Sequence, residues 1–87
     1  MKCDITFRNL EHTEALDDKI RQKSEKLSKF FGGNPEVNWV CWVQKDEQFA
    51  EVKLHDGKNH FQALASSDNL YKTIDLAIEK LQNQQKK

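Results

Sequence analysis

The first 44 residues change hydrophobic period twice, and this constrains the fold more than any other feature. Residues 2–8 alternate polar and apolar, with Cys3, Ile5 and Phe7 on one face, as in a half-buried strand. Apolar residues then recur at helical spacing, and alternation returns in residues 37–44. A strand, a helix and a second strand in this order predict a βαβ unit with parallel strands and a right-handed crossover.

The helix of this unit has recognisable ends. Thr13 is the predicted N-cap, and Glu14, Asp17 and Asp18 follow in the first turns, where acids suit the positive end of the helix dipole. Residues 32–35, Gly-Gly-Asn-Pro, end the helix. Its buried stripe consists of four apolar residues: Leu16, Ile20, Leu27 and Phe31.

The second half of the chain predicts a hairpin and a helix. Residues 48–55 and 59–65 alternate as strands, and Asp56-Gly57 is a strong signal for a two-residue turn between them. Residues 66–68 are expected to open the last helix. The inward strand residues are Ala50, Val52, Leu54, Phe61, Ala63 and Ala65. The apolar side of the helix carries Leu70, Ile74, Ala77, Ile78 and Leu81.

The predicted fold class is therefore α+β, with the order β-α-β-β-β-α. Two helices pack on one face of a four-stranded mixed sheet and leave the other face open. A length of 87 residues fits one domain, so we expect a single domain over residues 1–87, with residues 83–87 as a frayed tail.

Composition and motifs exclude several classes. The longest uncharged apolar run, residues 39–43, is far too short for a membrane span, and the N-terminus has no apolar signal region, so the cytoplasm is the expected location. Cys3 and Cys41 lie far apart and are expected to be buried reduced thiols. Phosphate-loop, dinucleotide, nucleophile and paired-carboxylate motifs are absent from the sequence. We therefore predict no enzyme activity, no cofactor and no metal.

The three histidines are expected to be surface polar residues. With Asp56-Gly57 as the turn, Lys53 would lie opposite His60, and His55 would lie near Lys58.

The formal net charge of zero is a sum of opposed segments. Residues 11–18 hold four acids and no base, whereas residues 19–29 hold five bases and one acid. On a helical wheel the lysines gather on one flank of each helix, and side-by-side helices would join them into one basic surface suited to phosphates. The alternative is a solvated face whose charges only complement the helix dipole. The lysines concerned are Lys19, Lys23, Lys26, Lys29, Lys72, Lys80 and Lys87.

The open sheet face is expected to carry an apolar patch. Trp39 and Trp42 differ by three positions and point to opposite faces, Trp39 to the core and Trp42 outward. Such a patch can stack RNA bases, pair two subunits or shield the sheet. Base stacking is the least favoured, because the face carries Glu51 and little positive charge beyond Lys53. The patch consists of Val40, Trp42, Phe49 and Leu64, with Phe49 and Leu64 expected opposite each other across the hairpin.

Spaced segments then carry a family resemblance. They are TEAL at residues 13–16, KLSKFF at 26–31 and DNLYKTID at 68–75, followed by Lys80-Leu81 and Gln84. In order and spacing, over nearly the whole chain, they resemble the ribosome hibernation-promoting factor family, also called ribosome-associated inhibitors or sigma-54 modulation proteins. The length resembles the short class of this family.

The resemblance implies a cytoplasmic, non-enzymatic bacterial factor. Such proteins bind the small ribosomal subunit near the decoding centre, occlude the mRNA and tRNA sites, and inhibit translation in stationary phase or stress. Short members promote ribosome dimers together with a separate modulation factor. The implied partners are the small subunit and its rRNA, with no membrane, and the protein itself is expected as a monomer or weak homodimer. Carried onto this chain, the rRNA-binding residues are Lys19, Lys23, Lys26, Lys29, Lys72, Lys80, Lys86 and Lys87.

Two other functions remain open from the residues. One is a protein–protein interaction module, or a paralogue that uses the open sheet face for self-association. The other is a generic binder of double-stranded RNA that recognises backbone shape.

Overall fold

The computed structural model describes residues 2–31 and 34–85, and its element order confirms the predicted β-α-β-β-β-α fold. The elements are β1 (Lys2–Arg8), α1 (Glu14–Phe31), β2 (Glu36–Gln44), β3 (Glu47–Asp56), β4 (Asn59–Ser67) and α2 (Leu70–Gln85). α2 takes in residues 83–85 of the expected tail, and residues 86–87 lie outside the described part.

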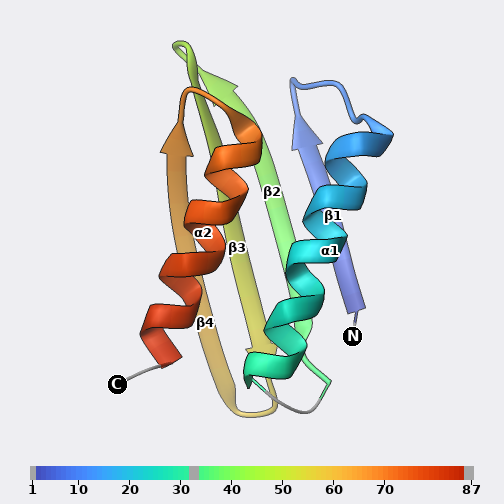
Figure 1. The fold of residues 1–87 in the computed structure, drawn as a ribbon, viewed down its shortest axis with the longest axis vertical. Coiled ribbons are helices and arrows are strands. Elements are labelled where there is room, and N and C mark those ends of the chain that lie inside the picture. Colours follow the sequence, from blue (N-terminus) through green and yellow to red (C-terminus); the bar gives the residue numbers. More distant parts are fainter. Residues whose placement is uncertain (1, 32–33, 86–87) are drawn as a thin grey trace.

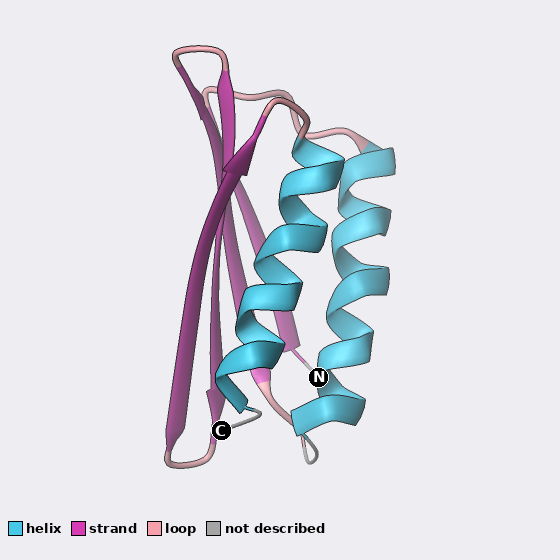
Figure 2. Ribbon diagram, turned by 60° about the vertical axis from the view of Figure 1, so that its left-hand side comes forward, coloured by secondary structure: helices cyan, strands magenta, loops and turns pink. Residues whose placement is uncertain are grey.

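The four strands form one mixed sheet in the order β1-β2-β3-β4. β1 and β2 pair in parallel, as the βαβ pattern predicts, and the other neighbours are antiparallel. The two helices lie next to each other and run in the same direction (Figure 1). Figure 2 shows that both cover the same face of the sheet, which leaves the opposite face open.

Side-chain caps fix where the helices begin. The backbone N–H of Leu16 donates to Thr13 Oγ1 at 3.2 Å, which confirms Thr13 as the cap of α1. At α2 the N–H of Tyr71 donates to Asn69 Oδ1 at 2.8 Å. The expected helix start at residues 66–68 was therefore wrong, because β4 continues to Ser67 and Asn69 supplies the cap.

The core lies between the helices and the inner sheet face. Trp39 is its largest fully buried side chain, with 1% of its surface exposed, and the predicted helical stripes pack around it. Val43 alternates in sequence with Trp39 and Cys41, which are buried in this core, but is itself 40% exposed. The reason is visible in Figure 2, where the β2–β3 hairpin extends past the ends of the helices, so nothing covers its tip.

The β3–β4 turn differs from the prediction by two residues in register. The turn residues are Gly57 and Lys58, and Gly57 has a φ of 60°. A glycine with positive φ at the first position is typical of a type II′ turn, whereas Asp56-Gly57 as a type I′ turn would also need a positive φ at Asp56, which the structure does not have. A shift of two residues leaves every side chain on its predicted face but changes its partner across the strands.

Candidate nucleic-acid interface

The basic surface predicted for the two helices is divided by intramolecular contacts. α1 and α2 form one layer on one face of the sheet (Figure 2), and this helix layer carries the described lysines of the prediction. The described lysines of this layer fall into three groups: those paired with Asp75, one bonded to the sheet, and those without an acidic partner in the described residues.

Asp75 of α2 holds two lysines of α1. Its Oδ1 lies 3.2 Å from Lys23 Nζ, and its Oδ2 lies 3.6 Å from Lys19 Nζ. Lys19 and Lys23 are four residues apart and therefore project from the same side of α1. These contacts cross the helix–helix interface and neutralise part of the expected basic surface.

Two other cations of the helices turn to the sheet. Lys80 Nζ donates to the backbone carbonyl of Leu64 in β4 at 2.9 Å. Arg21 donates to the carbonyl of Cys3 in β1 at 3.1 Å and also bonds the carboxylate of Asp17. The hydrogen bond from Arg21, and next that from His12, hold the pKa of Asp17 below its ordinary value. Arg21 and Lys80 are therefore engaged with other parts of the protein.

Three described lysines of the helix layer remain available. Lys26 and Lys29 lie on the second half of α1, and Lys72 lies in the first turn of α2. All three are exposed, and no carboxylate among residues 2–31 and 34–85 lies within ion-pair distance of them. Lys86 and Lys87 were also predicted to bind rRNA and lie outside the described residues.

The open sheet face carries the predicted apolar patch with different pairings. Trp42 of β2 lies directly opposite Phe49 of β3, and their rings stack at a centroid distance of 5.3 Å with 1° between their planes. The expected pairing of Phe49 with Leu64 was wrong because of the register shift. Leu64 instead lies opposite Glu51 and is 46% exposed.

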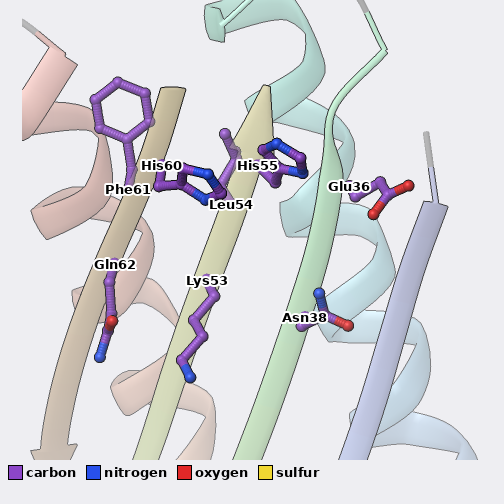
Figure 3. A pocket seen from close by; sticks show the side chains of 8 residues that line it. All are labelled: Glu36, Asn38, Lys53, Leu54, His55, His60, Phe61 and Gln62. Carbon is purple, nitrogen blue, oxygen red and sulfur yellow. The ribbon is translucent and has the colours of Figure 1, made fainter. Parts of the chain in front are cut away.

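The other end of this face is polar. His55 and His60 lie opposite each other and stack at 4.3 Å, so the expected pairs of Lys53 with His60 and of His55 with Lys58 were wrong. Both rings line an open groove of about 360 Å³. Figure 3 shows them next to each other, with Lys53 and Glu36 nearby. Within the described residues no group of three or more His, Cys, Asp or Glu side chains is arranged to hold a metal ion.

Both cysteines are free thiols on the inner side of the sheet. Burial raises the pKa of the Cys41 thiol to about 12 and also raises the pKa of Cys3. These pKa values keep both groups protonated at neutral pH, which opposes reactivity because the thiolate is the nucleophile.

The family of this chain is established by its similarity to known proteins. The sequence model of the family described as sigma 54 modulation protein / S30EA ribosomal protein matches residues 3–87. The chain belongs to this family. The family is non-enzymatic.

Relatives in the sigma 54 modulation protein family match along almost the whole chain. The ribosome hibernation promoting factor of Klebsiella oxytoca is 36% identical over 84 residues, which cover 97% of this chain and 88% of that protein. The factor of the same name from Salmonella typhimurium is 33% identical over the same shares of the two chains. Among solved structures, the N-terminal domain of Thermus thermophilus Protein Y superposes with a TM-score of 0.90 at 25% identity, covering 97% of this chain and 94% of that chain.

Asp75 is the residue of this surface whose role sequence reasoning missed. A helical wheel places it beside Lys72 on α2, but its actual partners lie on α1. A wheel drawn for one helix carries no information about how that helix packs against another. The available signal was only general: an acid on the lysine-bearing flank of a helix expected to lie beside a second lysine-bearing helix.

No helix in the described part of the chain is long and apolar enough to span a membrane.

Proposed function

We propose that this protein is a cytoplasmic ribosome hibernation factor. It binds the small ribosomal subunit near the decoding centre, occupies space needed by mRNA and tRNA, and inhibits translation in stationary phase or stress. The observation that carries this proposal is the 36% identity, over 97% of the chain, to a ribosome hibernation promoting factor. Promotion of ribosome dimers with a separate modulation factor belongs to the same proposal.

The mechanism depends on the shape of the domain and on its positive charges, and it involves no catalysed reaction. The helix layer faces rRNA, and its lysine ammonium groups meet phosphates as point charges, which fix position without reading sequence. Lys26, Lys29 and Lys72 are exposed and have no acidic partner in the described residues, so they supply the first contacts. The bulk of the folded domain then excludes mRNA and tRNA from the occupied site.

Sedimentation with ribosomes tests this function. The wild-type protein is expected to move with 30S and 70S particles through a low-salt sucrose gradient and to reduce translation in a cell-free extract. The variant Lys26→Gln/Lys29→Gln is expected to bind at least tenfold more weakly, since each lost phosphate contact removes charge attraction. Lys45→Gln/Lys58→Gln is the matched control, because it removes the same charge from two hairpin turns.

Either of two results contradicts the proposal. The wild-type protein remains at the top of the gradient, or both double variants lose affinity equally. Binding to a bare RNA duplex as tight as binding to ribosomes would instead favour the generic double-stranded RNA binder.

A second candidate function is self-association through the open sheet face. It is favoured by the stacked pair Trp42–Phe49 and by the exposed Leu64, an apolar patch on the face opposite the helices. Self-association would be supported if the size of the protein in solution rises with its concentration. Trp42→Ala should then abolish this rise without a loss of ribosome binding. A monomer at all concentrations would exclude it.

A further inference from the structure

Asp75 has an environment that distinguishes it from the other acids of the described chain. Its two carboxylate oxygens face two different ammonium groups, Lys23 at 3.2 Å and Lys19 at 3.6 Å. Among residues 2–31 and 34–85, no other carboxylate lies within 4 Å of a lysine ammonium. The Asp75 side chain is 49% exposed, so this three-residue cluster lies at the surface of the helix layer.

Such a cluster resembles a phosphate held between two lysines. A phosphodiester presents two unesterified oxygens that share one negative charge, and a carboxylate does the same. Lys19 and Lys23 project from one side of α1 at a spacing of four residues, so both can reach a single anion. Ion pairs at exposed positions are weak, so an incoming phosphate can replace the carboxylate.

We propose that Asp75 occupies the position of an RNA phosphate between Lys19 and Lys23 and competes with RNA for these two lysines. This inference rests on the proposed function, since it concerns the same helix layer. RNA that delivers a phosphate between the helices must first displace the carboxylate. The consequence is a lower affinity for RNA in general, with tight binding reserved for a partner that also engages Lys26, Lys29 and Lys72.

Removal of the competing charge is the test. Asp75→Asn keeps the size of the side chain and is expected to raise affinity for ribosomes about threefold to tenfold at low salt, as two weak ion pairs no longer oppose binding. The slope of log affinity against log salt is expected to steepen by about one to two, because each additional lysine–phosphate contact contributes about 0.7–0.9. Lys23→Gln is expected to cancel most of this gain in the Asp75→Asn background.

The matched control is Glu79→Gln, which removes one negative charge from an exposed position of the same helix that contacts no lysine in the described chain. It is expected to change the affinity less than twofold. Equal gains in affinity in the two variants would mean that the gain comes only from the change in net charge, and this would overturn the proposal. A loss of affinity in Asp75→Asn would also overturn it, because Asp75 would then position the lysines for binding.

Two further measurements separate this inference from the proposed function. Elution from a heparin column probes the lysines without ribosomes, and Asp75→Asn is expected to elute at higher salt than Glu79→Gln. If that order holds but no variant sediments with ribosomes, only the proposed function fails. On the unmodified protein, inorganic phosphate is expected to shift the NMR ammonium signals of Lys19 and Lys23 more than that of Lys45. Equal shifts would contradict the proposal even if Asp75→Asn did not fold.

Discussion

Ser24 lies on the buried side of α1, where a helical stripe ordinarily carries apolar residues. It is fully buried, and its Oγ accepts a hydrogen bond of 2.8 Å from Trp39 Nε1. Cys3 Sγ lies 3.8 Å from the same oxygen. An indole N–H in a core needs an acceptor, because an unpaired buried donor costs free energy. Ser24 therefore allows the largest core side chain to be completely buried.

Replacement of this acceptor is expected to destabilise the protein. Ser24→Ala leaves the indole N–H of Trp39 without its partner and should lower the free energy of unfolding by about 1–3 kcal/mol. Ser28→Ala is the control, because Ser28 is half-exposed and bonds only the carbonyl of Glu25, so its loss should stay within about 0.5 kcal/mol. Urea unfolding followed by tryptophan fluorescence measures both, and equal losses would contradict this account of Ser24.

For a single side chain, the sequence predicts the face of the strand or helix that it occupies better than the residue that it contacts. Alternation along the strand was enough to place Trp39 in the core and Trp42 outside it, and the structure confirms this. The Ser24–Trp39 and Lys23–Asp75 contacts depend on how α1 crosses the sheet and lies against α2. Neither crossing is encoded in the period of a single element.

Among the elements, α2 shows how a few polar atoms define a boundary. The side chain of Asn69 accepts a hydrogen bond from the N–H of Tyr71 at 2.8 Å. The buried hydroxyl of Thr73 donates to the carbonyl of Gln48 in β3 at 2.9 Å, which ties the first turn of the helix to the sheet. The start of α2 is therefore set by its cap and by its attachment to the sheet together.

Loss of this cap is expected to weaken the fold. Asn69→Ala should lower the free energy of unfolding by about 1 kcal/mol, the usual cost of removing an N-cap. Asn83→Ala changes the same residue type at an exposed position inside the same helix, where alanine is the better helix former, and should leave stability equal or slightly higher. Thermal unfolding by circular dichroism compares the two. Identical midpoints for the two variants would mean that Asn69 does not cap α2 in solution.

The order and faces of the elements were predictable because periods of 2 and 3.6 are distinct. The register of the β3–β4 hairpin was not. Turns at residues 56–57 and 57–58 both keep Ala63 and Ala65 in the core, so burial does not choose between them. The two turns differ in backbone: the structure has a positive φ at Gly57 but not at Asp56 or Lys58, which is the pattern of a type II′ turn that starts at Gly57.

Over the whole molecule, a net charge of zero coexists with an uneven surface. The cations of the helix layer are divided among acidic partners, the sheet and solvent. Within the described residues of this layer, only Lys26, Lys29 and Lys72 are exposed lysines with neither an acidic partner nor a hydrogen bond to the sheet. A net charge of zero by itself gives no indication of a nucleic-acid partner. The helical wheel made such a partner plausible, and the packing of the helices now shows which lysines are available.

The salt dependence of ribosome binding should report how many lysines of the protein contact phosphates. Three lysine–phosphate contacts predict a slope of about −2 to −3 for log affinity against log salt. A chain ending at Gln85 removes Lys86 and Lys87, so its slope gives the contribution of the described residues alone. Filter binding of radiolabelled protein to ribosomes between low and moderate salt measures it. A slope near zero would exclude lysine–phosphate contacts, and a slope of about −4, clearly beyond −3, would require the two lysines paired with Asp75 as well.

The hydrogen bonds from the helices to the outer strands also limit how this protein can polymerise. Arg21 bonds a backbone carbonyl of β1, and Lys80 and Gln84 bond those of Leu64 and Gln62 in β4. Outer strands with free backbone groups act as templates on which another polypeptide can add a strand. Here a second chain would have to displace side chains of the protein's own helices at both margins of the sheet. These helix side chains therefore oppose the addition of a further strand at either margin of the sheet.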